Sequence, residues 1–262
     1  MQLRHRVALN GAQLDELDER IIVLGVSESA PRDTLSAVSR FGGVGQRLTA
    51  RHRDTLDVAV RFGLRIKAGD MAGRSELFEQ IAGWAAGGGW LTLGHRPNRR
   101  LYVTCAQLPA MGDMADWTGE YSVTFRAYGV PYWSQVNPVT LVADGTRSLS
   151  RVMTVPGTVE TALEVTARNV SGMEIATMSI AAGSSRINLE GLGLGPWESL
   201  VIDHSEDGLL RIRIYGGGWR SAMACRTPGS SDELWVDPGA VQVQFGAQRA
   251  CQLSVLAYGR YV

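Results

Sequence analysis

Alternation of apolar and polar residues recurs along the chain and predicts a mainly β protein. The longest run covers residues 56–66, where every second residue is apolar, and a second run covers residues 121–127. A period of two residues is the pattern of a strand that buries one face. Both segments are therefore expected to be half-buried strands, with Arg61 and Arg65 on the polar face of the first.

Helical spacing appears convincingly once, after residue 70. Apolar residues recur there at the spacing of one helical face: Leu77, Phe78, Ile81, Trp84 and Ala85. Asp70 can cap the start of this helix, and the glycines at 87–89 can end it. An amphipathic helix of this kind is expected to pack on a sheet.

In the remainder of the first half, turn signals and composition predict the strands and loops. Asn10-Gly11 is a strong hairpin signal after an alternating segment, and a strand is expected near residues 21–26. Residues 30–45 are polar and rich in glycine toward their end, which predicts a long loop. Residues 46–53 are expected to form a strand that turns at Asp54 and pairs with 56–66.

Prolines mark a boundary in the middle of the chain. Pro131 cannot continue a strand ladder, and Asn137-Pro138 follows shortly after. We therefore expect two domains, at residues 1–135 and 136–262. The second is read as all β, with strands near 163–168, 241–245 and 251–255 and a hairpin over 200–214. Short strands separated by turns are typical of a β-sandwich.

Length, charge and cysteine content narrow the possible functions. A chain of 262 residues with a net charge of zero has no overall attraction for nucleic acid or an anionic membrane. No run approaches the ~20 apolar residues of a membrane span, and the first residues lack a signal-peptide core. The three cysteines, Cys105, Cys225 and Cys251, are expected to be reduced thiols.

The usual signatures of catalysis and cofactor binding are missing. The glycines of 191–195 are followed by Pro196-Trp197 and a strand, with no helix to hold a phosphate. No histidine has metal-ligand spacing, and Asp203-His204-Ser205 is read as a solvated hairpin tip. The acidic pairs 206–207 and 232–233 are read as solubilising loop residues. We expect no catalytic residue, metal or cofactor.

A basic stretch has three possible interpretations. The stretch could be the exposed side of a sheet, a subunit interface or a nucleic-acid patch, and its arginines are Arg47, Arg51, Arg53, Arg61 and Arg65. The candidates for a subunit interface are Arg47, Arg51, Arg61 and Arg65. The nucleic-acid interpretation is the weakest, because Phe62 falls on the opposite face from the arginines. An interface would match the arginines with carboxylates of a neighbour.

Several motifs in a fixed order resemble the siphophage-type distal tail protein family. They begin with Phe41-Gly-Gly-Val-Gly45, the long strand, the helix ending Ile81-Ala-Gly-Trp84, and Trp90-Leu91. Then come Arg99-Arg-Leu-Tyr-Val103, residues 121–128, Pro131-Tyr132-Trp133, Arg226-Thr-Pro-Gly-Ser-Ser-Asp232 and Ala257-Tyr-Gly-Arg260. The resemblance spans nearly the whole chain, and its weight lies in the order and spacing of the motifs.

The resemblance implies a structural virion protein made in the bacterial host cytoplasm. Such proteins form rings, commonly hexameric, at the distal end of the phage tail tube and join it to the tail hub, baseplate and receptor-binding machinery. The first domain is then a sandwich-like or barrel-like ring domain with one helix, and the second a galectin-like β-sandwich. The partners are further copies of the chain, the tube protein and the hub protein.

Two other classes of function stay open at this stage. A carbohydrate-binding module would use exposed aromatic residues of the second domain, for which Trp197, Tyr215, Trp219 and Trp235 are the candidates. Packing in a core or an interface is the preferred explanation of these four residues. An enzyme of cell-wall degradation is the third class, and no motif supports it.

Overall fold

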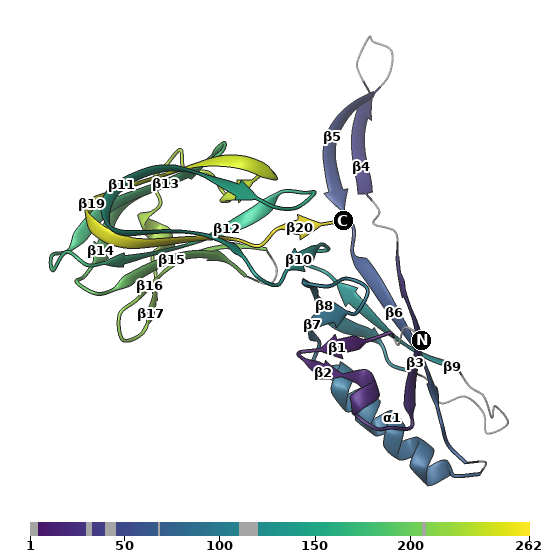
Figure 1. Cartoon of the computed structure of the whole chain (residues 1–262). Helices are drawn as coiled ribbons and strands as arrows, with labels where there is room; N and C mark the ends of the chain where they lie inside the picture. Colours follow the sequence, from purple (N-terminus) through teal and green to yellow (C-terminus); the bar gives the residue numbers. More distant parts are fainter. Residues whose placement is uncertain (1–4, 30–32, 40–45, 68, 110–119, 206–207) are drawn as a thin grey trace. The chain divides into compact units, whose positions relative to one another are not determined.

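The computed structural model describes residues 5–29, 33–39, 46–67, 69–109, 120–205 and 208–262. The chain divides into two units, Met1–Trp133 and Ser134–Val262. Strands dominate both units, so the expected mainly β fold is confirmed (Figure 1). Among the described residues, no helix is long and apolar enough to cross a bilayer.

The first unit is built on a sheet with the strand order β2-β1-β7-β8-β9-β6-β3. Its strands are β1 (Val7–Leu9), β2 (Ala12–Gln13), β3 (Ile21–Glu28), β6 (Leu56–Leu64), β7 (Gly89–Leu93), β8 (Arg99–Gln107) and β9 (Glu120–Ala127). A short 3-10 helix, η1 (Leu14–Glu16), follows β2. The two predicted runs are neighbours within the sheet, because β6 pairs antiparallel with β9 from Leu56 to Gly63.

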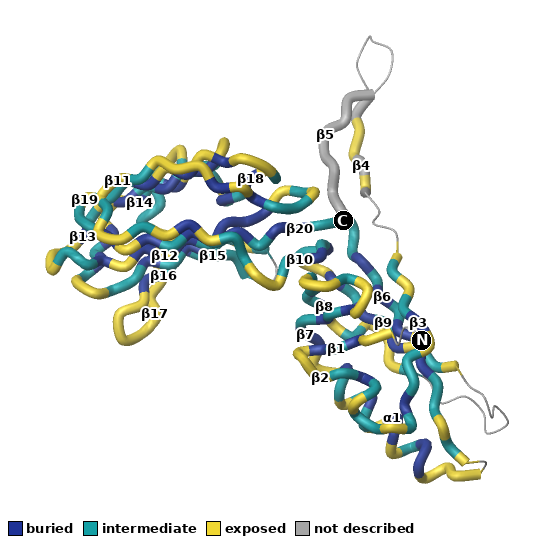
Figure 2. The backbone as a smooth tube through the Cα atoms, in the orientation of Figure 1, coloured by how far each residue is buried: buried dark blue, intermediate teal, exposed yellow. Residues whose placement is uncertain are grey.

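Helix α1 (Met71–Ala86) covers one face of this sheet, as its apolar stripe predicts. The Asp70 side chain accepts a hydrogen bond from the Gly73 amide at 2.9 Å and caps the first turn. The ring of Phe78 meets Tyr121 of β9 edge-on with centroids 4.8 Å apart, and Trp84 meets Phe125 at 5.6 Å. The apolar face of β6 and β9 is thus buried under the helix (Figure 2).

Asn10 joins the β1–β2 hairpin to the end of α1. Asn10 and Gly11 both have positive φ angles, 52° and 86°, as the Asn-Gly turn signal predicts. The Asn10 amide nitrogen donates to the Gly88 carbonyl, and its oxygen accepts from the Trp90 amide, each at 2.9 Å. Gly89 has a φ of 132°, and a side chain there would meet the Asn10 oxygen at 2.1 Å.

Strands β4 (Asp33–Ser39) and β5 (Gln46–Arg53) form a separate two-stranded sheet. Two sequence predictions are therefore wrong. Part of the expected loop is strand β4, and β5 pairs with β4 rather than with β6. β6 instead pairs with β3 and β9. The motif Phe41–Gly45 lies outside the described residues.

The second unit is a curled sheet of long, bent strands. Its main path has the order β14-β13-β19-β12-β15-β16-β17, with β11 paired to β19 and β18 to β12. The strands are β11 (Val139–Val155), β12 (Thr161–Asn169), β13 (Ile175–Ala182), β14 (Ser185–Leu194), β15 (Ser199–His204), β16 (Leu210–Tyr215), β17 (Trp219–Ser221), β18 (Trp235–Val236) and β19 (Gly239–Ala257). Strand β10 (Trp133–Gln135), the 3-10 helix η2 (Met223–Cys225) and β20 (Arg260–Tyr261) complete the chain.

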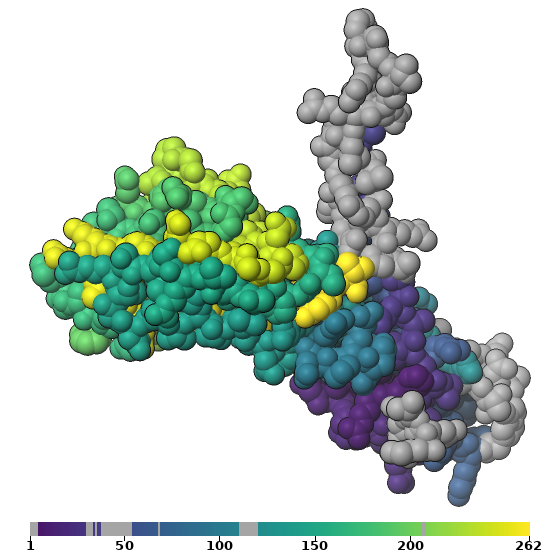
Figure 3. All heavy atoms as spheres, turned by 45° about the horizontal axis from the view of Figure 1, so that its top comes forward, coloured from purple at the N-terminus to yellow at the C-terminus, as the bar shows by residue number. Residues whose placement is uncertain are grey.

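β19 passes through both layers of this unit. Its first half pairs with β13 around Phe245, and its second half pairs with β12 around Leu253. β11 follows β19 throughout, with register shifts between Ala143 and Ser148 where the strands change layer. Irregularities of this kind let one strand turn the corner of a sandwich. Figure 3 shows β11 (teal) and β19 (yellow) side by side at the surface of this unit.

The buried residues of the second unit lie between these two layers. They include Leu163, Ile180, Leu189, Ile202 and Phe245, each less than a tenth exposed. The sequence predicts strands at 241–245 and 251–255, which are the two halves of β19 rather than separate strands. Cys251 is buried within it, and the three cysteines are unpaired.

A pair of glycine substitutions tests the contacts between Asn10 and the segment that follows α1. Gly89→Ala is expected to destabilise the first unit by about 1–3 kcal/mol, because the new side chain collides with Asn10 and the φ angle becomes strained. Gly83→Ala is the control, since it lies in α1 with open space around it. It should stabilise by about 0.4–1 kcal/mol. Urea unfolding followed by circular dichroism gives both values, and equal effects of the two changes would contradict this account.

Limited proteolysis tests the boundary between the two domains. Val136 and Asn137 are exposed between β10 and β11. A broad-specificity protease is expected to cut there and leave two resistant fragments, because buried strands present no extended substrate. Mass spectrometry identifies the sites. First cuts within β6 or β19 would show that the proposed boundary is wrong.

Candidate assembly site

The face of the first sheet opposite α1 carries charges that are paired within the chain. Asp57 of β6 accepts hydrogen bonds from both ends of the Arg126 guanidinium of β9, at 2.6 and 2.7 Å. These bonds from Arg126 lower the pKa of Asp57. Further along β6, Arg61 Nη1 lies 3.3 Å from Glu120 Oε2 of β9, and both side chains are more than half exposed. Exposed pairs contribute little to stability, so their main effect is to neutralise the face.

The structure separates the four predicted interface arginines into two places. Arg61 is exposed on β6, and Arg65 is exposed just beyond the end of that strand. Arg47 and Arg51 are on β5, and their side chains lie outside the described residues. Because β5 does not pair with β6, the four arginines do not share one two-stranded ladder. Their role as a subunit interface stays a prediction.

Three carboxylates close to the arginines in sequence have other partners in the chain. Asp54 accepts a hydrogen bond from the Thr34 hydroxyl at 2.9 Å. Asp57 holds Arg126, and Asp70 caps α1. Arg61 instead finds Glu120, which is distant in sequence but lies on the neighbouring strand. Strand pairing, which sequence spacing alone does not give, decides these contacts.

A second polar centre lies at the end of β3, where Glu28 binds three side chains. Its carboxylate accepts from Trp133 Nε1 at 2.9 Å, from Arg96 Nε at 3.0 Å and from His95 Nε2 at 3.0 Å. The Arg96 guanidinium also lies over the Trp133 ring, 5.2 Å from its centroid. Trp133 is 1% exposed. Glu28 therefore ties the last residue of the first unit to β3 and to the turn between β7 and β8.

The surroundings of Glu28 favour its charged form. Partial burial by itself raises the pKa of Glu28, but hydrogen bonds from Arg96 and His95, with the charge of Arg96, outweigh this effect. The net result is a pKa below the ordinary value of 4.5. The sequence identifies Trp133 as a boundary residue but gives no sign of its distant partner Glu28.

Three of the four predicted aromatic residues are exposed. Trp197 is 62% exposed, Trp219 55% and Tyr215 49%, so packing in the core does not explain them. The Tyr215 and Trp219 rings lie together, with centroids 5.1 Å apart. Trp235 differs, because it is only partly exposed and its Nε1 donates to Glu233 Oε2 at 3.1 Å.

His204 is not at a solvated hairpin tip as predicted. Its side chain is 6% exposed, and its Nε2 lies 2.9 Å from Glu233 Oε2. Burial lowers the pKa of His204 despite the opposing effect of Glu233. Glu233 therefore has a structural partner and is more than a solubilising residue. Residues 206–207 lie outside the described part of the chain.

Residues 191–194 of the glycine-rich segment form the end of strand β14, and no helix follows the segment. Its positive φ angles at Gly191 and Gly193 mark local bends. Within the described residues, no group of three or more histidine, cysteine, aspartate or glutamate side chains is placed to hold a metal ion.

Comparison with known proteins gives a likeness in fold. No family model matches the sequence, and no curated protein matches it. Among solved structures, the Dit protein of phage SPP1 matches with a TM-score of 0.67 at 13% identity, over 98% of this chain and 99% of that chain. It is described as a paradigm of the hub adsorption apparatus in phages that infect Gram-positive bacteria.

Two structures of the phage p2 baseplate in its activated conformation also match. Their TM-scores are 0.47 and 0.48, both at 6% identity, over 97% and 99% of this chain and 97% and 98% of the matched chains. The SPP1 likeness shows that this chain has the Dit fold from end to end.

A substitution at Glu28 tests the second polar centre. Glu28→Gln is expected to destabilise the first unit by about 1–3 kcal/mol at pH 7, because it leaves Arg96 without its carboxylate. The pKa of Glu28 is lowered on folding, so its contribution is present above pH 4.5 and is lost as the pH falls through the lowered value. Melting temperatures of the two proteins should therefore converge in acid.

The control for this experiment is Glu79→Gln, at an exposed position of α1. It should change the melting temperature little at any pH. A constant difference between wild type and Glu28→Gln from pH 7 into acid would contradict the proposed role of the charge.

Proposed function

We propose that this chain is a distal tail protein, a structural component of a phage tail tip or baseplate that links the tail tube to the host-adsorption machinery. The observation that carries the proposal is the match to SPP1 Dit over 98% of this chain and 99% of that chain. The motif order in the sequence points to the same family independently. The protein would therefore act in the virion, at the end of the tail.

A structural role agrees with the chemistry of the described residues. The polar centres at Glu28 and Asp57 bind arginine, tryptophan and histidine side chains, and such contacts hold strands together. The carbohydrate-binding alternative is not favoured, because SPP1 Dit, the matched structure, is described as part of a hub adsorption apparatus. A non-enzymatic function is proposed on the same ground.

The proposal includes a closed ring of copies, most simply a hexamer, formed by the first unit. β3 ends the sheet and has no strand partner on its outer side among the described residues. An unpaired edge is a template for pairing with another chain. Leu24 on this edge is 39% exposed. Contact of this edge with a different surface of the next copy would be head-to-tail, which closes into a ring by rotation.

The neighbours of such a ring would be the tail tube protein on one side and the tail hub on the other. A ring that passes a genome should avoid a continuous basic surface, because many phosphate contacts would retain the DNA. The in-chain pairs Arg61–Glu120 and Arg126–Asp57 support this, since they neutralise one face of the sheet. No specific nucleic-acid binding is proposed.

Light scattering after size exclusion tests the ring. The wild type is expected to elute at micromolar concentration as a closed oligomer of one size. Arg61→Glu should weaken this oligomer, because it places a second carboxylate beside Glu120 next to the β3 edge. Its circular dichroism should be unchanged, since the apolar face of β6 is untouched.

Arg151→Glu is the matched control, at an exposed position in the second unit. It should leave the oligomer intact. A wild type that is monomeric at every salt concentration would overturn the ring. The Arg61→Glu variant could instead stay oligomeric while losing a salt-sensitive DNA binding that the wild type shows. That result would mean that Arg61 belongs to a DNA-binding surface and not to a subunit interface.

A further inference from the structure

Four strands of the second unit place a row of residues on its outer side. Arg168 of β12 pairs with Ser199 of β15, Ser199 pairs with Tyr215 of β16, and Tyr215 pairs with Trp219 of β17. Directly paired residues project to the same side of a sheet. Leu200 and Ile214, the residues next to Ser199 and Tyr215 in the sequence, are buried. Because successive side chains of a strand point to opposite faces, the row faces outward.

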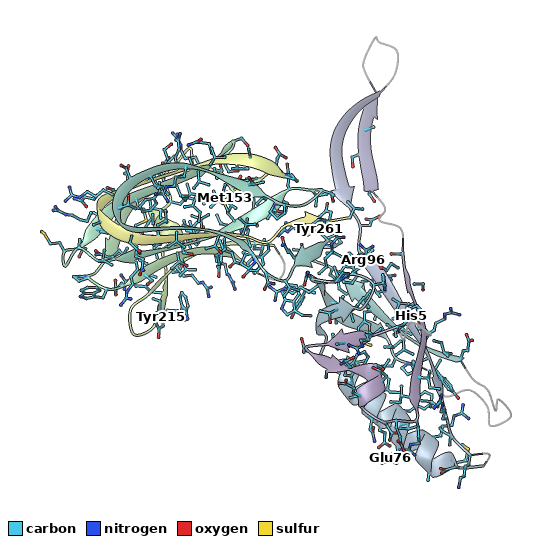
Figure 4. The ribbon with its side chains drawn as sticks, viewed as in Figure 1. His5, Glu76, Arg96, Met153, Tyr215 and Tyr261 are labelled. Carbon is cyan, nitrogen blue, oxygen red and sulfur yellow. The ribbon has the colours of Figure 1, made fainter. Side chains whose placement is uncertain are left out.

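The two aromatic rings of this row form one exposed surface. Tyr215 and Trp219 contact each other, and the Arg213 guanidinium lies 4.4 Å from the Trp219 centroid. Figure 4 labels Tyr215 on this hairpin, and Figure 2 shows β17 as exposed. We call the surface made by Arg168, Trp197, Arg213, Tyr215 and Trp219 the aromatic–arginine face.

Trp197 is held on this face in an unfavourable backbone conformation. Its φ is 66°, a left-handed value that is uncommon for a bulky side chain. Its amide donates to the Asn169 carbonyl at 2.9 Å, and the Asn169 amide donates to the Glu198 carbonyl at 2.9 Å. Asn169 is fully buried. These hydrogen bonds to the buried Asn169 hold the strained backbone of Trp197, whose ring stays exposed. Strained backbone conformations of this kind are common at functional sites.

The charge around the rings is positive. Asp203 is shared by two arginines, with Arg211 Nη2 at 2.9 Å and Arg213 Nη2 at 2.6 Å. Arg168 lies over the Trp197 ring at 5.6 Å and has no ion pair with any described residue. The carboxylate of this face is therefore already bound, and an uncompensated guanidinium remains beside an exposed ring.

We propose that the aromatic–arginine face docks an acidic, partly apolar segment of another protein. Tryptophan, tyrosine and arginine are the residues that dominate binding energy in protein interfaces. The positive charge of Arg168 complements a carboxylate-bearing partner. This inference goes beyond the proposed ring, because it concerns the second unit and does not depend on how the first unit assembles.

A saccharide fits these observations less well than a protein. Small ligands bind in concave sites with free polar groups. The face lies on a sheet surface, and Asp203 is occupied by arginines. The described open pocket of about 320 Å³ lies elsewhere, over β13, β14 and β19 near Ser179 and Asn188.

A random peptide library displayed on a carrier and selected against the full-length protein tests the proposal. We expect enriched peptides that combine aspartate or glutamate with apolar residues. Trp219→Ala should weaken their binding about tenfold or more, as expected of a central aromatic contact. Arg168→Glu should also weaken peptide binding, because the attraction between Arg168 and the acidic peptide becomes a repulsion. This loss should grow as the salt concentration is lowered, because salt screens the repulsion.

Tyr128→Ala is the matched control, since Tyr128 is a 58% exposed aromatic residue of the first unit. It should bind the peptides as the wild type does. No enrichment, peptides without an acidic bias, or equal binding by Trp219→Ala would each overturn the proposal. Binding of neutral oligosaccharides that Trp219→Ala abolishes would assign the face to a saccharide instead. The oligomeric state of Trp219→Ala, measured by light scattering after size exclusion, should match that of the wild type. A loss of peptide binding can then be distinguished from a failure of the proposed ring.

Discussion

Every strand presents peptide groups on both sides, and these groups must find hydrogen-bond partners. The two units meet this constraint differently. In the second, β11 and β19 bend and serve both layers, so the sheet curls around its own core. In the first, the sheet stays open and ends at β3. The edge at β3 is the surface that the proposed ring would use, whereas the bent strands of the second unit enclose its core.

Much of the fold could be predicted from the sequence because burial imposes a local period. Alternation locates β6 and β9, and the helical stripe locates α1. Strand β4 could not be recognised, because its apolar residues Leu35, Ala37 and Val38 do not alternate strictly with polar ones. Its partner β5 was identified as a strand but paired incorrectly, because without β4 the adjacent strand β6 was the nearest candidate partner in the sequence.

The candidate sites were less predictable than the fold, because they depend on contacts between distant residues. Glu28 meets Trp133 across 105 positions, and Arg61 meets Glu120 across 59. The exposure of Trp197 follows from its backbone conformation, which the surrounding residues hold in place. His204 is buried although its neighbours in sequence are polar, because Glu233 approaches it from another segment.

The place of β19 in the chain has a consequence for synthesis. This strand pairs with β11, β12 and β13, yet it is made after all three of them. Until residues 239–257 leave the ribosome, the earlier strands lack their central partner, and their apolar faces stay exposed. Strands β1 to β9 of the first unit are complete by residue 127 and do not wait for β19. Folding would thus proceed in chain order, and a product interrupted before β19 would carry a finished first unit beside an unclosed second one.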